Sequence, residues 1–332
     1  MVFIIFFFVI SNFQYFERSL KIIIDIFIIS FSLFFLLYLV YSNSFINLDC
    51  YNGWFYNHKF IFVENSHFSI ISVPIINYYI FKFLDNYKYK RNDYIIIIFF
   101  LIFFIISLIN FSTTFLVGLI LTQSYILIKN LDKKKLIITS LILITLSISI
   151  LLNFKQCSER SIGSIKPIFE LYFFKNKNKN KSLDEKKEIL NNENFRINMS
   201  VETLLVSLEI TYNSLVNNPF GVGFNKYQLA HKNYIDQIVK VDSSIKKNNI
   251  YDGSTNLSKI FTEFGIFGIF IVLFFLFSLL RKKNFTDFDI FLISLICLQF
   301  IRGVGYFNGG FIMILIIYFY KIYIDNLKLE TS

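Results

Sequence analysis

The stretch SKIFTEFGIFGIFIVLFFLFSLL, residues 258–280, decides the fold class of this sequence. A helix that crosses a bilayer needs about 20 mainly apolar residues, and this stretch meets that length. Three basic residues, Arg281, Lys282 and Lys283, follow it directly. Basic residues are enriched at the cytoplasmic ends of membrane-spanning helices. The stretch therefore predicts a transmembrane helix that ends on the cytoplasmic side.

The same apolar character extends over the whole chain. Of its 332 residues, 55% are hydrophobic and 20% are aromatic, while only 17% are charged. An ordinary soluble domain has roughly 25% charged residues, and a soluble fold of this composition would expose large apolar patches. The composition thus excludes a soluble enzyme, a disordered chain and a nucleic-acid-binding protein. It predicts an all-α polytopic membrane protein.

Further apolar segments of suitable length accompany the first one. They lie at 20–42, 67–84, 94–110, 112–129, 136–153, 285–301 and 309–324. Residues 2–15 are a shorter candidate. They do not resemble a cleavable signal peptide, because they lack its basic start and its small-residue cleavage site. We therefore expect about nine spans, with about six in residues 1–153 and about three in residues 258–332.

The positions of Lys and Arg predict the orientation. If every candidate spans, the strongly basic connections all fall on one side, and that side is cytoplasmic. The net charge of +10 is in part this topology signal. It places the C-terminus inside and, with nine spans, the N-terminus outside. We expect a multi-pass membrane protein.

One connection, residues 154–257, is polar and about a hundred residues long, and this topology places it on the outer face of the membrane. The segment KNKNKNKSLDEKKEILNNEN (175–194) within this connection is charged and of low complexity, which is typical of a solvent-exposed loop. Residues 200–217 instead repeat apolar side chains at helical spacing. They predict an amphipathic helix that lies against the membrane or the helix bundle and ends at Asn217-Asn218-Pro219.

Glycine is concentrated in one part of the chain, with nine of the twelve glycines between residues 221 and 310. Glycine lets a backbone approach a ligand or another helix closely. The segments concerned are NNPFGVGFNKY (217–227), DGSTNLSKIFTEFGIFG (252–268) and QFIRGVGYFNGG (299–310). The predicted topology makes all three converge on the outer, non-cytoplasmic face of the membrane, where we expect the functional site.

These segments, taken in order, resemble the Wzy-type O-antigen polymerase and O-antigen ligase superfamily. NPFGVGF (218–224) is similar to the PLFGVG-like turn of that family, and TEFGIFG (262–268) to its E-x-G-I-x-G-like start of a span. NFSTTFLVGLILTQ (110–123) looks like its Ser/Thr-rich span start, although the Arg that often follows the Ser is Thr113 here. The resemblance covers about residues 110–325.

The resemblance implies transfer of a glycan from undecaprenyl pyrophosphate at the periplasmic face, without a metal or other cofactor. The acceptor is another lipid-linked repeat unit or lipid A core. In the family, arginines bind the pyrophosphate and a polar side chain activates the acceptor hydroxyl. A departing pyrophosphate gains negative charge, which bidentate Arg stabilises well. The implied partners are the lipid-linked glycan and membrane lipid; whether a chain-length regulator protein binds stays open.

Three functions remain open at this stage. Ligases typically carry His-Asn or His-Ser ahead of the glycines, but Ser254-Thr255 stands at that position and His231 lies more than thirty residues before Gly265. This favours a polymerase over a ligase. A transporter or flippase of lipid-linked sugars is the other alternative. It predicts repeated span pairs and charges near the bilayer midplane, which this sequence lacks.

The candidate site residues follow from these motifs. Arg196 and Arg302 are the main candidates for binding pyrophosphate. Glu263 or Asp252 would act on the acceptor hydroxyl, although a buried Glu263 could instead pair with Lys259, four residues earlier. The further candidates for binding pyrophosphate or glycan are Arg160, Lys166, His231, Asn218, Gly221, Gly223 and Asn225.

Overall fold

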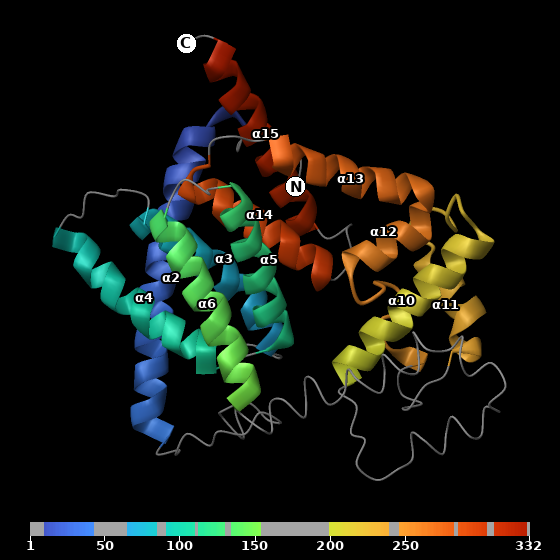
Figure 1. The fold of residues 1–332 in the computed structure, drawn as a ribbon, viewed down its shortest axis with the longest axis horizontal. Coiled ribbons are helices and arrows are strands. Elements are labelled where there is room, and N and C mark those ends of the chain that lie inside the picture. Colours follow the sequence, from blue (N-terminus) through green and yellow to red (C-terminus); the bar gives the residue numbers. More distant parts are fainter. Residues whose placement is uncertain are drawn as a thin grey trace. The chain divides into compact units, whose positions relative to one another are not determined.

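The computed structural model describes residues 10–42, 65–84, 91–109, 112–129, 134–153, 199–238, 246–281, 285–303 and 309–330. Within these ranges the regular elements are eleven α-helices and one short 3-10 helix, and there is no strand (Figure 1). The all-α prediction is therefore confirmed for the part of the chain that the structure describes.

The chain groups into two compact units. The bundle unit comprises Met1–Thr145, Leu279–Arg302 and Phe307–Ser332, and the motif unit comprises Leu146–Ser278 and Gly303–Tyr306. The division predicted from the sequence, into 1–153, 154–257 and 258–332, follows membrane topology instead and stays a prediction.

The bundle unit has a core of packed aromatic rings. Its helices are α2 (Phe13–Ser42), α3 (Asn65–Leu84), α4 (Arg91–Ile109), α5 (Thr113–Lys129), most of α6 (Lys134–Asn153), α14 (Asp287–Ile301) and α15 (Gly309–Glu330). The rings of Phe31, Phe68 and Phe103 meet with centroid separations of 5.2, 5.7 and 5.9 Å. These separations lie within the range that aromatic pairs prefer, so the rings tie α2, α3 and α4 together.

A buried polar network joins four helices of the bundle unit. The amide nitrogen of Asn77 donates to Thr122 Oγ1 at 2.7 Å and to Ser294 Oγ at 3.1 Å. Gln123 donates to the Asn77 amide oxygen and accepts a hydrogen bond from Ser140 at 2.6 Å. All five side chains are buried. Because buried polar groups need partners, this network fixes which faces of α3, α5, α6 and α14 meet.

Two of the described helices contain a segment long and apolar enough to cross a membrane, Phe13–Tyr38 and His67–Leu84. The expectation of about nine spans is therefore not confirmed. Some of the predicted spans are too short as helices: α14, for example, has 15 residues and measures about 22 Å at 1.5 Å per residue. That is shorter than a hydrocarbon core of about 30 Å. Most of the candidate span 2–15 lies outside the described residues.

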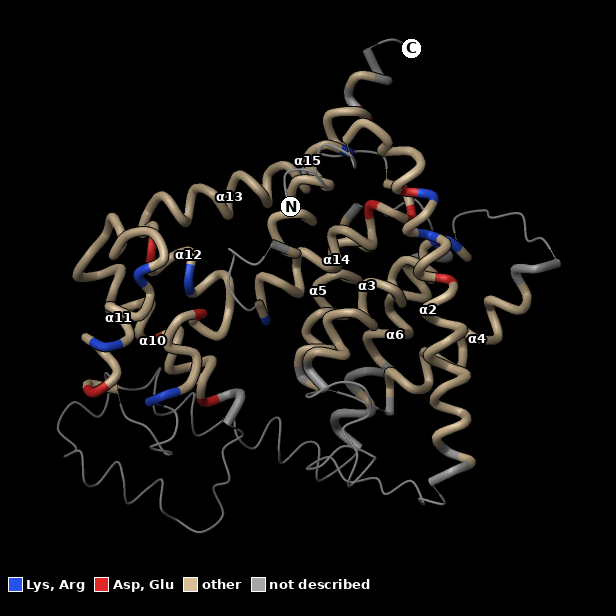
Figure 2. The backbone as a smooth tube through the Cα atoms, turned by 180° about the vertical axis from the view of Figure 1, so that it is seen from behind, with Lys and Arg blue, Asp and Glu red and all other residues tan. Residues whose placement is uncertain are grey.

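The motif unit is built from α10 (Met199–Asn217), α11 (Tyr227–Tyr234), η2 (Ile235–Gln237), α12 (Asn256–Phe264) and most of α13 (Ile266–Arg281). Helix α10 packs against α11 and α12. The helix predicted over residues 200–217 is confirmed and begins one residue earlier than expected. In Figure 2, α13 carries no charged residue between Ile266 and Leu279.

The span predicted over residues 258–280 is not one continuous helix. Helix α12 ends at Phe264, Gly265 adopts a left-handed φ of 57°, and α13 begins at Ile266. Glycine is the residue that most readily adopts this conformation, and it commonly ends helices. The chain therefore changes direction at Gly265, and only the following segment, Ile266–Leu279, is a purely apolar helix.

Candidate functional site

The glycine turn after α10 is bonded to the end of α12. The backbone N–H of Val222 donates to the Thr262 carbonyl, and that of Gly223 to the Glu263 carbonyl, each at 3.0 Å. The N–H of Ile266 donates to the Pro219 carbonyl at 2.8 Å. We call the two segments, residues 218–227 and 262–266, the glycine clasp. It joins, backbone to backbone, the two motifs that the sequence places about forty residues apart.

Two glycines make this close approach possible. Gly221 has φ 86° and Gly265 has φ 57°, both in the left-handed region. A Cβ on Gly221 would overlap the carbonyl group of Glu263, and one on Gly265 would overlap the carbonyl oxygen of Pro219. Gly223 also has a positive φ, 101°, but an added Cβ there would only reach the Lys226 side chain at 3.5 Å. Gly221 and Gly265 are therefore required for space as well as for conformation.

The Glu263 side chain holds the far end of the turn. It is buried, and its two oxygens accept backbone hydrogen bonds from Asn225 at 2.7 Å and from Tyr227 at 3.0 Å. Tyr227 is the first residue of α11. The first N–H groups of a helix have no partner within the helix, and a carboxylate there is stabilised by the helix dipole. Glu263 thus caps α11 and fixes the end of the clasp.

A buried lysine compensates the charge of Glu263. The Lys259 ammonium lies 3.9 Å from the Glu263 carboxylate and donates to the Tyr251 carbonyl at 2.8 Å and to the Asn225 side-chain oxygen at 3.4 Å. The pairing expected from the four-residue spacing is therefore confirmed. A buried charge is tolerated when it is paired and hydrogen-bonded, and both conditions hold here.

Hydroxyl groups line the contact between α10 and α12. Thr262 donates to Thr211 Oγ1 at 3.0 Å, and Thr211 donates to the Ser207 carbonyl at 2.8 Å. The Ser207 hydroxyl donates to the carbonyl of Gly253. We call this contact the hydroxyl seam. Because the side chains are short, the two helix backbones approach closely.

The Tyr227 ring extends the hydroxyl seam below the clasp. Its hydroxyl donates to Ser207 Oγ at 3.3 Å. Burial raises the pKa of the Tyr227 hydroxyl, the charge of Asp252 raises it further, and the bond with Ser207 acts in the opposite direction. Tyr227 therefore stays a neutral hydrogen-bond donor near neutral pH.

The segment before α12 contains an unusual backbone conformation. Ser254 has φ 62°, a conformation that costs a non-glycine residue about 1–2 kcal/mol. Its hydroxyl accepts from Asn249 at 2.8 Å and donates to the Thr203 carbonyl at 3.3 Å. Thr255 then caps α12 by accepting the Ser258 N–H at 2.9 Å. Ser254 and Thr255, which the resemblance sets at the place of the ligase histidine, thus both have structural partners.

The other predicted site residues lie in different places. Asp252 is half-buried in this segment, 3.5 Å from the Ser254 N–H. His231 is buried on α11, with its ring 6.4 Å from that of Tyr227. Asn218 is exposed at the start of the clasp.

The predicted pyrophosphate-binding residues fall in other parts of the chain. Arg302 is half-buried at the C-terminal cap of α14, in the bundle unit. Arg160, Lys166 and Arg196 lie outside the described residues. The structure therefore brings Glu263, Gly221, Gly223 and Asn225 together in the clasp.

Two site features were missed by the sequence analysis. The Tyr227 backbone and hydroxyl both contribute to the clasp surroundings, and no sequence signal points to them. The hydroxyl seam has a weak signal: Ser207, Thr211 and Ser214 follow one another at helical spacing, as Ser258 and Thr262 do. The larger apolar residues of α10 give the stronger signal in the sequence.

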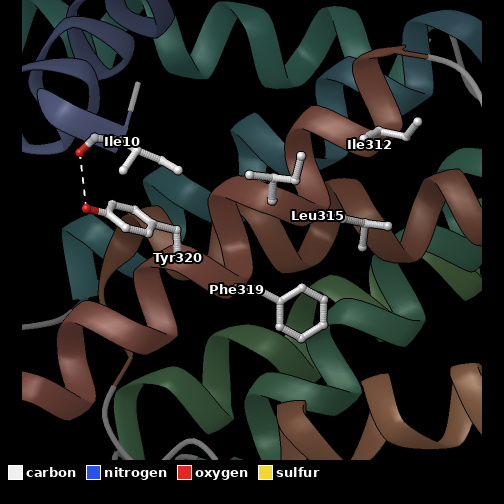
Figure 3. Close-up of a pocket in the computed structure, with 6 residues that line it drawn as sticks. Ile10, Ile312, Leu315, Phe319 and Tyr320 are labelled. Carbon is white, nitrogen blue, oxygen red and sulfur yellow. Dashed lines mark hydrogen bonds between the residues drawn. The ribbon is translucent and has the colours of Figure 1, made fainter. Parts of the chain in front are cut away.

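The bundle unit has an apolar groove, shown in Figure 3, that contains none of the predicted site residues. Its lining is formed by Ile10, Ile312, Leu315, Ile316, Phe319 and Tyr320. The Tyr320 hydroxyl, the main polar group drawn there, donates to the Ile10 carbonyl at 3.1 Å. Because the Tyr320 hydroxyl is already hydrogen-bonded, the groove is an apolar surface without a candidate catalytic group.

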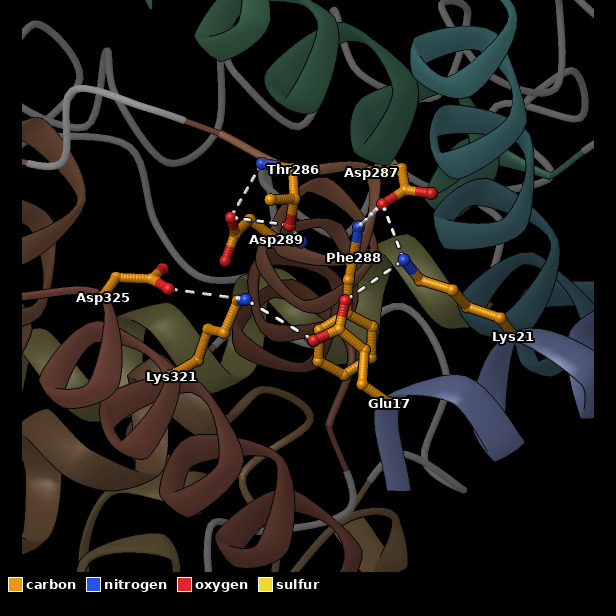
Figure 4. A network of polar contacts seen from close by, with 8 residues as sticks. All are labelled: Glu17, Lys21, Thr286, Asp287, Phe288, Asp289, Lys321 and Asp325. Carbon is orange, nitrogen blue, oxygen red and sulfur yellow. Dashed lines mark hydrogen bonds and ion pairs between the residues drawn. The ribbon is translucent and has the colours of Figure 1, made fainter. Parts of the chain in front are cut away.

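Charged side chains of the bundle unit form an ionic network between α2, α14 and α15 (Figure 4). Lys21 lies 3.1 Å from both Glu17 and Asp287, and Lys321 lies 3.5 Å from both Glu17 and Asp325. Each lysine thus faces two carboxylates. The network ties three helices together, and each of these five charged side chains has an ionic partner within it.

Comparison of the chain with protein-family models, curated proteins and solved structures found no match.

Proposed function

We propose that this chain is a Wzy-type polysaccharide polymerase, a glycosyltransferase that extends undecaprenyl-pyrophosphate-linked repeat units at the periplasmic face of the inner membrane. The glycine clasp is the observation that supports this most. The two motifs behind the resemblance, NPFGVGF and TEFGIFG, are bonded to each other through three backbone hydrogen bonds. Motifs that act in one site should meet in the fold, and these two do.

The proposed protein is multi-pass, with about nine spans. Exposed apolar side chains on α2 support a membrane environment, among them Ile22, Ile23 and Ile26. A monomeric soluble protein rarely exposes contiguous apolar patches of this kind. The two helices that are long enough to span agree with this placement.

The proposed reaction is an inverting transfer. The acceptor hydroxyl oxygen attacks the anomeric carbon of the donor sugar, the bond from that carbon to the pyrophosphate oxygen breaks, and undecaprenyl pyrophosphate leaves. Arg196 and Arg302, with Arg160 and Lys166, would stabilise its charge. A base takes the hydroxyl proton, and it must be within hydrogen-bond reach of that hydroxyl.

Asp252 suits the role of base better than Glu263. The Glu263 carboxylate is buried and both of its oxygens accept backbone hydrogen bonds, so we propose a positioning role for it. Asp252 is half-buried and is not held by such bonds beyond a weak one from Ser254. His231, Asn218, Gly221, Gly223 and Asn225 would then shape the surface that receives the glycan.

The test is elongation of lipid-linked repeat units by the purified protein in detergent, without any gradient. We expect polymer ladders from the unaltered protein and none from Arg302→Ala, with Arg281→Ala as the control on the predicted cytoplasmic side. Normal ladders from Arg302→Ala would remove Arg302 from the mechanism. Failure of the unaltered protein to elongate would contradict the polymerase, whereas elongation without a gradient would contradict a transporter or flippase.

A deletion strain separates the polymerase from the O-antigen ligase. Loss of a polymerase leaves single repeat units attached to lipid A core, because ligation continues. Loss of a ligase instead accumulates long polymer on the lipid carrier. A gel of surface polysaccharide distinguishes the two outcomes.

A further inference from the structure

The outer side of the glycine clasp carries exposed aromatic rings. Phe220 is 71% exposed, Phe224 51% and Phe267 58%. The rings of Phe220 and Phe267 lie 6.1 Å apart, and those of Phe224 and Phe264 lie 6.2 Å apart. These rings contribute little to the interior of the motif unit. An exposed apolar patch of this kind marks an interaction surface.

The patch is continuous with α13, the helix that begins within the clasp. Apolar side chains of α13 are exposed at Ile266, Phe267, Ile269, Phe270, Ile271, Leu273, Phe274, Leu276 and Phe277. Successive residues of a helix are about 100° apart, so these side chains cover more than half of its circumference, while Phe275 and Leu279 on the remaining side are buried. A helix that is apolar all round is surrounded by protein or by lipid.

The same surface is poor in charge. No charged residue occurs from Ile210 to Asn225, nor from Phe264 to Leu280. Among the described residues of the motif unit, one exposed charge, Lys226, lies at the end of the clasp, and the others lie on and after α11, at Lys232, Asp236, Lys246 and Lys247. Exposed apolar residues also follow one another along α10, at Leu208, Tyr212 and Val216. An aromatic surface that is poor in charge fits the boundary between lipid headgroups and acyl chains.

We propose that the glycine clasp is embedded in the outer leaflet of the bilayer, with Phe220 and Phe224 inserted at the boundary between headgroups and acyl chains. Lipid is the occupant that fits, because the patch continues into an apolar helix and its one exposed charge among the described residues, Lys226, lies at the end of the clasp, where a lysine can reach the headgroups. The clasp backbone then lies at the depth of lipid-linked pyrophosphate. This inference rests on the membrane placement of the proposed function and is independent of the transferase chemistry.

The depth of these residues can be measured by tryptophan fluorescence. The chain has one tryptophan, Trp54, so Trp54→Phe provides a silent background for Phe220→Trp or Phe224→Trp. The full chain is reconstituted into vesicles of phosphatidylethanolamine and phosphatidylglycerol that contain phosphatidylcholine brominated at shallow or deep acyl positions. Gln228→Trp, at an exposed position of α11, is the matched control.

We expect shallow bromines to quench the fluorescence at positions 220 and 224 at least about twofold more than deep bromines do. We expect the control at 228 to be quenched by aqueous iodide and not by either lipid. Iodide quenching at 220 and 224 equal to that at 228 would overturn the proposal. Protection from both iodide and bromolipid would overturn it as well, since it would mean that a protein surface covers the rings.

The same reconstituted protein separates this inference from the proposed function. Bromolipid quenching together with an absence of elongation would keep the membrane placement and contradict the polymerase. Elongation without bromolipid quenching would keep the polymerase and contradict the placement.

Discussion

The helices within the bundle unit and the helices within the motif unit are held together by different kinds of contact. In the bundle unit, large side chains fill the space between helices, as Phe31, Phe68 and Phe103 do. In the motif unit, short hydroxyl side chains such as Thr211 and Thr262 separate the helices, and backbone groups bond directly across the clasp. The aromatic cluster of the bundle unit depends on side-chain volume, whereas the clasp of the motif unit depends on backbone geometry.

This difference predicts where each unit is sensitive to substitution. A core filled by large side chains gains about 1.5–3 kcal/mol from each and tolerates apolar exchanges that keep the volume. Backbone contacts admit no such exchange, because a single Cβ or a lost acceptor disturbs several bonds. We therefore expect the motif unit to respond strongly at a few positions. Hydrogen exchange by mass spectrometry in detergent can follow peptides of α12 and α3 separately.

The largest effect is expected from Gly265→Ala. The added Cβ would overlap the Pro219 carbonyl oxygen, and the residue would have to keep a left-handed φ of 57°. We expect a loss of at least about 4 kcal/mol, which is in the exceptional class for single substitutions. Peptides of α12 and of residues 218–227 should lose their exchange protection, while those of α3 keep it.

Gly223→Ala is the matched control for Gly265→Ala. It imposes the same conformational demand, with φ 101°, but its Cβ would meet only the Lys226 side chain at 3.5 Å. We expect about 1–2 kcal/mol from the left-handed conformation alone. Equal losses from the two variants would mean that the close approach in the clasp contributes nothing, and the comparison between the units would fail at this point.

Glu263→Ala is expected to come next. It removes the acceptor of the Asn225 and Tyr227 N–H groups and leaves Lys259 buried without its carboxylate. Removing one partner of a buried ion pair costs about 3–5 kcal/mol. Exchange should accelerate in α11 and in residues 218–227, and not in α3.

Glu263→Gln keeps the shape and one acceptor oxygen, so we expect a smaller loss of about 1–3 kcal/mol. A positioning residue should be partly rescued by this variant, in fold and in elongation together. If Glu263→Gln folds as the unaltered protein does but elongates no polymer, Glu263 itself handles a proton and its positioning role is wrong.

The sequence was sufficient for features that repeat along the chain. Helical spacing predicted α10 to within one residue, and the four-residue spacing predicted the contact of Glu263 with Lys259. It was wrong about the continuous span over 258–280. That span is decided by the conformation of one residue, Gly265, and a glycine within an apolar run can equally well continue a helix.

The remaining site features depend on contacts between distant segments. The bonds from Asn225 and Tyr227 to Glu263 join residues 38 and 36 positions apart and use backbone N–H groups, which every non-proline residue has. No residue type marks such a donor. The sequence also left open which side chains of α10 face the protein: Ser207 and Thr211 are buried, while the larger Leu208 and Tyr212 are exposed.

A smaller effect, in the other unit, is expected from Asn77→Leu. Asn77 donates to Thr122 and Ser294 and accepts from Gln123 within the bundle. A hydrogen bond within a folded protein contributes about 0.5–1.5 kcal/mol net, so we expect a loss of about 1–2 kcal/mol. Peptides of α3 should exchange faster and those of α12 should not; Ser72→Ala, on the same helix, is the control.

The smallest effect is expected from the hydroxyl seam, measured by a double-mutant cycle of Thr211→Val and Thr262→Val. Thr262 donates to Thr211, and both hydroxyls are buried. Each single change leaves one polar group without this partner, whereas the double change removes both groups at nearly constant volume. The two losses should therefore not add, and the coupling should be about 0.5–1 kcal/mol. Strict additivity would show that the seam is held by packing alone, as the aromatic cluster of the bundle unit is, and the contrast between the two units would then rest on the clasp.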